Sequence, residues 1–239
     1  MFDGQLGRLI SLLKDRGVYN NTVIFYTADN GPHQGEERSD IHWSTNFLRQ
    51  CKASNFEGGL RVPGIMHSPA HIKTHRNVTT PTVTMDILPT IMDLLNVESD
   101  HPDWEMDGMS LLPYIGDKTD LPRPDPIGIS WGQQKVVGYL AIIDNDWKLL
   151  TTKYNTTTTG GLQGQCEFQP PYSTMKNIDP YLMFNLAEDY HELYDQKTLQ
   201  PAKFKHMMQQ LADFKASLTK SQMTETGCGK KKEDWKEKK

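Results

Sequence analysis

The sequence predicts an α/β fold in which helices are layered on a mixed β-sheet, followed by a small antiparallel sheet with a final helix. Two observations carry this prediction. Near the N-terminus an amphipathic helix at 2–16 leads through a short turn into a buried strand at 22–27, which is an αβ unit of a layered domain. Further along, strand-like runs at 138–143 and 147–152 flank a short polar turn, which is typical of a β-hairpin.

The N-terminal helix is predicted from apolar residues that recur at helical spacing, namely Phe2, Leu6, Leu9, Ile10 and Leu13. Gly17 is a typical stop signal after it. Residues 60–68 have the composition of a second short strand, interrupted by Pro63. Helical spacing returns at 84–95, where Pro89 falls in the first turns and is tolerated.

The second half begins with a stretch from about 97 to 135 that is rich in Pro, Gly and Asp, which indicates a surface passage or a subdomain boundary. After the hairpin we expect a low-complexity mobile loop at 156–164, a strand at 182–185 and a helix at 202–218. The predicted division is an α/β domain, a small α+β subdomain and a disordered lysine-rich tail, at 1–110, 111–218 and 219–239.

Charge argues against nucleic acid as a partner, since the 239 residues carry a net charge of -4. The lysines of the tail are interrupted by acids, so we interpret it as a solvated end. No window holds the roughly 18 apolar residues that a membrane span needs. The N-terminus has neither the basic flank nor the apolar run of a signal peptide.

Three cysteines are too widely spaced for a zinc knuckle and too few for a disulfide scaffold: Cys51, Cys166 and Cys228. One disulfide with one spare cysteine fits this number. Three Asn-x-Thr sequons, which suit a secretory glycoprotein, start at Asn20, Asn77 and Asn155.

The strand at 22–27 is followed by Asp29, Asn30 and Gly31, which place two oxygen-bearing side chains at the exit of a buried strand. Carboxylate and amide oxygens suit Ca²⁺ or Mg²⁺. In open α/β sheets ligands bind at this end of the strands. Asp-Asn-Gly is also a common turn sequence, so a plain turn stays open as an alternative.

Lys52 stands five residues before Glu57, Gly58 and Gly59, in a segment where paired glycines let the backbone turn closely beside a ligand. A lysine at such a place can bind an anionic oxygen as a compact charge. The alternative is an ordinary solvated surface lysine.

The order of these features resembles the sulfatase family, in particular the arylsulfatase A and N-acetylgalactosamine-6-sulfatase group. The resemblance covers residues 1 to about 215. It rests on a series of short motifs, which are Thr-Ala-Asp-Asn-Gly-Pro at 27–32, Lys52 with Phe-Glu-Gly-Gly-Leu-Arg-Val-Pro at 56–63, Met-Asp-Ile-Leu-Pro-Thr at 85–90, Asp-Gly-Met-Ser-Leu-Leu-Pro at 107–113, Trp-Lys-Leu at 147–149 and Leu-Met-Phe-Asn-Leu at 182–186.

The resemblance implies an alkaline-phosphatase-like core in the first domain, a bound Ca²⁺, and a formylglycine nucleophile that attacks the sulfur of a sulfate ester. By position, Asp29 and Asn30 resemble two of the calcium ligands, and Lys52 resembles the lysine that contacts the substrate. Glu57 and Arg61 match further family positions, and we interpret them as support for the loop, with charges that could satisfy one another.

The resemblance also implies a disulfide between Cys51 and Cys166, which leaves Cys228 free or intermolecular, and a lysosomal or extracellular location. The family's nucleophile motif, Cys-x-Pro-Ser-Arg, does not occur in the sequence, nor does its opening Asp-Asp pair. We therefore expect the C-terminal part of a sulfatase, whose partner is the N-terminal half of the same protein and which is inactive by itself.

Two alternatives remain. The chain could be a non-catalytic module that keeps the sulfatase scaffold and binds a metal or an anion. It could also be a phosphatase or phosphonate hydrolase of the same superfamily, although the spacing from Lys52 to Glu57 fits the sulfatase pattern better.

Overall fold

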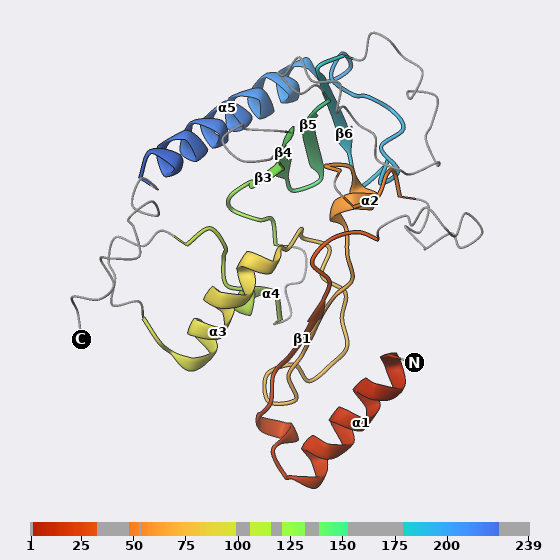
Figure 1. Ribbon diagram of the computed structural model, residues 1–239, viewed down its shortest axis with the longest axis vertical. Coiled ribbons are helices and arrows are strands. Elements are labelled where there is room, and N and C mark those ends of the chain that lie inside the picture. The colour runs from red at the N-terminus through yellow and green to blue at the C-terminus, as the bar shows by residue number, and fades with distance from the viewer. Residues whose placement is uncertain are drawn as a thin grey trace, which may run out of the picture. The chain divides into compact units, whose positions relative to one another are not determined.

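The computed structural model describes residues 2–32, 48–52, 54–98, 106–115, 121–131, 139–152 and 179–224 (Figure 1). Its contacts divide the chain into two compact units that interleave in sequence. The first unit comprises Met1–Asn30 and Arg61–Pro124, and the second comprises Gly31–Leu60 and Asp125–Lys239. This division differs from the sequence-based boundary at residue 110, because the segment before Arg61 belongs with the C-terminal sheet.

The first unit opens with helix α1 (Phe2–Asp15), a short 3-10 turn (Tyr19–Asn21) and strand β1 (Ile24–Thr27). The predicted stop at Gly17 is confirmed, since this glycine has a φ of +70°. Strand β1 pairs antiparallel with β2 (Gly64–His67), so the two N-terminal strands predicted separately form one ladder. No residue of α1 is buried, although the ring of Phe2 lies 5.3 Å from that of Tyr26.

The rest of the first unit consists of a 3-10 turn (Thr84–Asp86), helix α3 (Ile87–Leu95) and the single turn α4 (Leu112–Ile115). Together the 3-10 turn and α3 fill the range predicted as one helix. Helix α3 ends at Asn96, which adopts the left-handed conformation with φ 51°. Among the described residues of this unit, Tyr114 is the only buried apolar side chain. The apolar side chains of helices α1 and α3 are therefore accessible.

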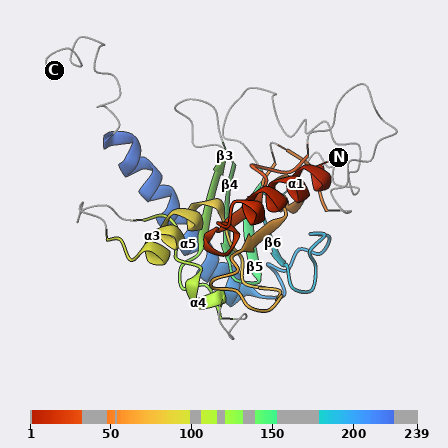
Figure 2. The same ribbon diagram turned by 90° about the horizontal axis from the view of Figure 1, so that it is seen from below.

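The second unit is built on a four-stranded antiparallel meander, β3-β4-β5-β6, whose strands lie side by side (Figures 1 and 2). The strands are Ile127–Trp131, Tyr139–Asp144, Trp147–Thr151 and Tyr181–Asn185. The predicted hairpin is confirmed as β4 and β5, with Asp144 opposite Trp147. The strand predicted at 182–185 is β6. Strand β3 falls in the stretch that the sequence indicated to be a surface passage.

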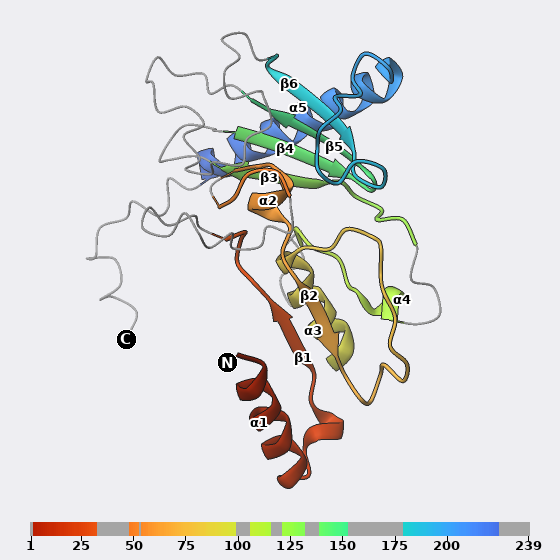
Figure 3. The same ribbon diagram turned by 90° about the vertical axis from the view of Figure 1, so that its right-hand side faces the viewer.

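Helix α5 (Pro201–Thr224) covers one face of this sheet, as Figure 3 shows, and runs six residues beyond its predicted end. Its buried Met207 and Leu211 pack with Leu140, Ile142, Leu149 and Met183 of the sheet. Close approach of helix and sheet is possible because β3 has Gly128 there: a Cβ at this position would lie 2.4 Å from the ring of Phe214.

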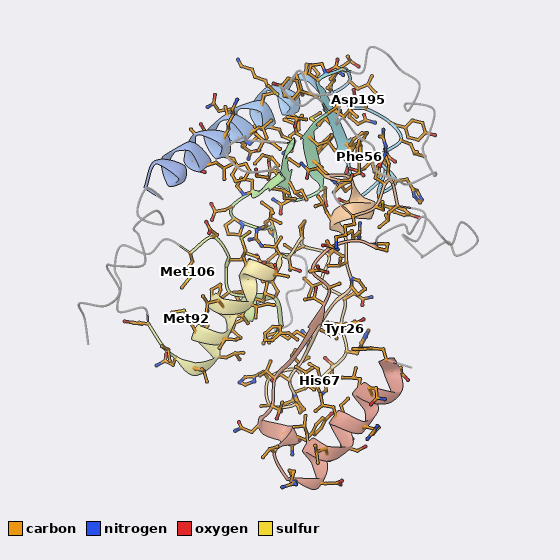
Figure 4. All side chains as sticks on the ribbon, in the orientation of Figure 1. Tyr26, Phe56, His67, Met92, Met106 and Asp195 are labelled. Atoms are coloured by element: carbon orange, nitrogen blue, oxygen red, sulfur yellow. The ribbon has the colours of Figure 1, made fainter. Side chains whose placement is uncertain are left out.

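The opposite face of the sheet packs against the segment that precedes helix α2 (Glu57–Leu60). Phe56 is buried there with four residues of the strands, Ala141, Leu150, Leu182 and Phe184 (Figure 4). Burial on both faces explains why β4 and β5 are apolar almost throughout and not alternating. The packing of Phe56 also fixes α2 against the sheet, which positions the candidate site.

Candidate functional site

The first part of the candidate site is the exit of strand β1. Asp29 and Asn30 follow the last strand residue, Thr27, by two and three positions. The side chain of Asp29 is exposed and that of Asn30 is half-buried. Two hard oxygen donors in an accessible loop fit part of a Ca²⁺ shell, which takes six to eight oxygens. Within the described residues no three His, Cys, Asp or Glu side chains converge, so these donors would form only part of a cage.

The next two residues, Gly31 and Pro32, belong to the second unit and are hydrogen-bonded within it. The amide of Gly31 donates to the carbonyl of Gly59 at 2.8 Å, and the amide of Lys52 donates to the carbonyl of Pro32 at 3.0 Å. Gly31 has to be glycine here, because a Cβ would lie 1.9 Å from the carbonyl oxygen of Gly58. The backbone of Lys52 is thus bonded to the segment that directly follows Asn30.

Lys52 is exposed, and the residue before it is anchored. Its own side chain is exposed, whereas Cys51 is buried and disulfide-bonded. An exposed ammonium group on a fastened backbone can receive an anionic oxygen without reorganisation of the loop. The role in substrate binding that the sequence predicts for Lys52 stays a prediction.

Glu57, at the start of α2, joins a buried charge network beneath this segment. The Nζ atom of Lys148, on β5, lies 2.9 Å from Oε1 of Glu57 and 2.8 Å from Oε1 of Glu192. The side chains of Lys148 and Glu192 have no exposed surface, and Glu57 is almost fully buried. Glu57 therefore has a cation partner in Lys148, a different one from the Arg61 considered in the sequence; Arg61 is exposed.

Main-chain atoms complete the network. The amide of Glu57 donates to Oε2 of Glu192 at 2.7 Å, and Nη1 of Arg49 donates to the carbonyl oxygen of Glu192 at 2.8 Å. The guanidinium carbon of Arg49 stands 4.0 Å from the centre of the Phe56 ring. Residues 49 and 57 are thereby held by a loop that lies more than 130 positions later in the chain.

Protonation in this network follows from one lysine shared by two buried carboxylates. Burial raises the pKa of Glu192 above its usual value, and the attraction of Lys148 opposes this only in part. Burial alone would lower the pKa of Lys148, but the charges of Glu192 and Glu57 raise it. Lys148 is consequently a permanent cation at neutral pH, and Glu192 takes up a proton more readily than an exposed glutamate does.

A second buried ion pair lies in the first unit. Arg123 binds both carboxylate oxygens of Asp86, at 2.8 and 2.9 Å. The same oxygens accept the amides of Val83 and Met109, so the carboxylate ties together segments that are distant in sequence. Each carboxylate oxygen of Asp86 accepts two hydrogen bonds, and we interpret this pair as structural.

The remaining sequence-predicted positions are distributed over the surface or lie outside the described residues. The sequon asparagines Asn20 and Asn77 are exposed. Asn155, Cys166 and Cys228 lie outside the described residues, so the Cys51–Cys166 pairing stays a prediction. Sequence reasoning did not assign Lys148 or Glu192 to the site. A signal was present at Lys148, which is a charged residue between the apolar residues of a buried strand.

Comparisons with known proteins agree on one family. Residues 2–97 match the model of the family described as Sulfatase. The steryl-sulfatase of Homo sapiens is 35% identical over 120 residues, which is 49% of this chain and 20% of the relative. Arylsulfatase A of Bos taurus is 28% identical over 200 residues, which is 81% of this chain and 37% of the relative. The chain thus spans well under half the length of these curated relatives.

The fold leads to the same family. The crystal structure of the PsFucS1 sulfatase from Pseudoalteromonas sp. superimposes with a TM-score of 0.62 at 25% sequence identity, over 89% of this chain and 40% of that one. The predicted alkaline-phosphatase-like α/β architecture with its antiparallel C-terminal sheet is confirmed at this level. Across the described residues, no helix is both long and apolar enough to cross a membrane.

Proposed function

Because this chain belongs to the sulfatase family, as its match over residues 2–97 and its steryl-sulfatase and arylsulfatase relatives show, we propose that it forms part of a calcium-dependent sulfuric ester hydrolase. Its contribution is to bind the cation and the sulfate group. The observation that carries the proposal is the backbone bond from Lys52 to Pro32, which fastens an exposed lysine to the chain directly after Asp29 and Asn30.

Each residue has a distinct task in this proposal. The oxygens of Asp29 and Asn30 hold a Ca²⁺ ion, with the remaining ligands supplied from elsewhere. Such an ion would neutralise the negative charge that develops on the sulfate oxygens. Lys52 donates hydrogen bonds from its ammonium group to an oxygen of the sulfate ester and orients the ester for attack. Because it acts as a point charge, this role tolerates different alcohol groups on the ester.

The attacking nucleophile is proposed to come from a separate segment. The sequence contains no Cys-x-Pro-Ser-Arg motif, from which the family's formylglycine is made. Lys52 and the metal ligands can bind an anion but have no group positioned to attack it. Hydrolysis would therefore require the complementary N-terminal half of a sulfatase.

An oxidising compartment is part of the proposal. Cys51 is disulfide-bonded, and disulfides persist in secreted and lumenal proteins. The exposed sequon asparagines Asn20 and Asn77 are accessible to glycosylation. These features support a secretory-pathway protein of lysosomal or extracellular destination.

The test combines the full chain with a separately expressed arylsulfatase N-terminal half that carries formylglycine. We expect the mixture to hydrolyse an aryl sulfate and the chain alone to show no activity above background. Lys52→Ala should remove most of the activity of the mixture, whereas the control Lys205→Ala, at an exposed position on α5, should leave it unchanged. Sulfate release by the chain alone would overturn the proposal.

The alternative function is a sulfatase-like binding module, which the absent nucleophile motif favours. It predicts an inactive mixture together with binding of inorganic sulfate that Lys52→Ala abolishes. The activity of the mixture separates the two functions, because both of them predict sulfate binding that calorimetry finds weakened by Lys52→Ala.

A further inference from the structure

The charge network beneath the Lys52 segment points to a role beyond stability. We propose that Lys148 and Glu192 are positioning residues, which hold residues 49–57 so that Lys52 is presented in one place. The role of Lys52 towards the sulfate rests on the function proposed above. The positioning itself does not, because it concerns only contacts within the second unit.

The segment at residues 49–57 is held at both ends. At one end, Arg49 donates to the carbonyl oxygen of Glu192 and stacks on Phe56. At the other end, Glu57 contacts Lys148 through its carboxylate and Glu192 through its amide. The amide of Gly58 closes the segment on itself by donating to the carbonyl of Arg49 at 2.7 Å. Lys52 lies on the arc between these two fixed ends.

The backbone of Glu192 is held in a conformation that suits the positioning role. This residue has a φ of +57°, a left-handed conformation that is unfavourable for a residue with a long side chain. The conformation is supported by Asp189, whose carbonyl accepts the amide of Glu192 and whose carboxylate accepts the amides of Leu193 and Tyr194. An unfavourable backbone that is supported in this way serves to aim the carboxylate at Glu57 and Lys148.

Packing alone does not require a buried charge at position 148. Phe56 already fills the apolar space against the sheet, so an apolar residue in place of Lys148 would suffice for packing alone. Charged groups are costly to bury, and a well-packed apolar replacement of a whole buried pair is often neutral. What an ion pair adds is direction, because Nζ of Lys148 must meet two carboxylates at hydrogen-bonding distance.

The test is residue-resolved amide hydrogen exchange on the full chain. Lys148→Met should raise exchange at the amides of Lys52, Glu57 and Gly58 by roughly tenfold or more, since each of these amides is bonded within or to the held segment. Exchange at the amides of β4 and β5 should rise by a smaller factor, which reflects only the loss of global stability when the buried carboxylates lose their cation. The control Lys197→Met removes a partly exposed lysine that pairs with Asp179 and Asp195 and should change none of these amides.

A second pair of variants separates the effect of the side-chain length at residue 192 from the effect of its charge. Glu192→Gln keeps the length of the side chain and an oxygen for the amide of Glu57, so protection of the segment should be retained. Glu192→Asp keeps the charge and tolerates the left-handed backbone, but it is one methylene short and should lose protection as Lys148→Met does. This comparison decides the matter if Lys148→Met fails to fold.

Two results would overturn the inference. Unchanged exchange at Lys52, Glu57 and Gly58 in Glu192→Asp would show that the segment is held by other contacts. A uniform rise that includes β4 and β5 would show a general loss of stability without a positioning effect. Neither readout involves substrate, so failure here is distinguishable from failure of the proposed function, which the Lys52→Ala activity test decides.

Discussion

The amide of Gly31 bonds to the carbonyl of Gly59, and each of these glycines lies where a side chain would collide with a backbone carbonyl. This contact joins the loop after the proposed calcium ligands to the glycine pair of α2. The approach of the two main chains explains the glycine at 31, whose Cβ would meet the carbonyl oxygen of Gly58, whereas a Cβ at Gly59 would meet the carbonyl oxygen of Ser54 at 2.3 Å.

Replacement of Gly31 by alanine should therefore destabilise the second unit by about 1–3 kcal/mol, since the added Cβ forces the backbones apart. Thermal unfolding measures the effect. Gly7→Ala is the matched control, because a Cβ at Gly7 meets nothing within 4 Å on α1 and alanine favours a helix there by about 0.5–1 kcal/mol. Equal melting temperatures for Gly31→Ala and the wild type would contradict the observed approach.

The buried pair of Asp86 and Arg123 gives a second prediction. Arg123→Met leaves the Asp86 carboxylate buried without its cation, which should cost about 3–5 kcal/mol. Lys203→Met, which breaks a partly exposed pair with Asp144, should cost only about 0–1 kcal/mol. Urea denaturation compares them. The double variant Asp86→Asn with Arg123→Met should lose less than the sum of the single variants, and strict additivity would speak against a direct interaction.

Glu192 predicts a pH dependence of stability. Its pKa is raised above the usual value of 4.5, chiefly by burial, so the folded protein keeps a proton that the unfolded chain releases. This contribution is fully present below pH 4.5 and is lost as the pH rises through the folded pKa. Glu192→Gln does not titrate at this position. Its urea midpoint, relative to that of the wild type, should therefore rise as the pH increases from 4.5 through the folded pKa of Glu192.

Glu188→Gln removes an exposed carboxylate from the same loop and supplies the baseline for that comparison. A midpoint difference between Glu192→Gln and the wild type that stays constant from pH 4 to well above neutrality, relative to this baseline, would mean that Glu192 titrates as in the unfolded chain.

Calcium binding is expected to be weak in this chain alone. Asp29 and Asn30 supply only part of the oxygen shell, so the affinity should be far from the nanomolar class of complete cages. Isothermal calorimetry should show that Asp29→Ala abolishes what binding there is, whereas Asp15→Ala, at an exposed position on α1, leaves it unchanged. Tight stoichiometric binding that survives Asp29→Ala would place the site elsewhere.

The partner of Cys51 is expected to be Cys166. A bridge that closes a loop of this length could stabilise the fold by about 4 kcal/mol in the chain-entropy model. Non-reducing peptide mapping should recover a peptide from the Cys51 region joined to one containing Cys166, with Cys228 in a separate peptide. Recovery of Cys51 joined to Cys228 would refute the pairing.

Local signals predicted most elements, and long-range contacts account for the rest. The β4–β5 hairpin was predictable because Asn145, which adopts a φ of 53°, sits between two largely apolar runs and is a typical turn residue. Strand β3 was not, because Gly128 weakens a strand locally. It becomes a strand through its pairing with β4 and the approach of Phe214.

The same distinction holds for the site. Asp29, Asn30 and Lys52 lie within short motifs, so the sequence could place them together as candidates. The partners of Glu57 could not be found in this way, because Lys148 and Glu192 are 91 and 135 positions away in the chain. A nearby charge, Arg61, was the natural candidate on sequence distance alone, and tertiary packing selected a more distant one.

These separations have a consequence for the order of events during synthesis. A ribosome that has completed residues 49–60 still has more than a hundred residues to add before it reaches Glu192, so the Lys52 segment cannot reach its final conformation until most of the chain has been made. Closing such long loops is slow, and it must await the C-terminal meander. A chain truncated before residue 192 would therefore contain the whole Lys52 segment but could not hold it in its final conformation.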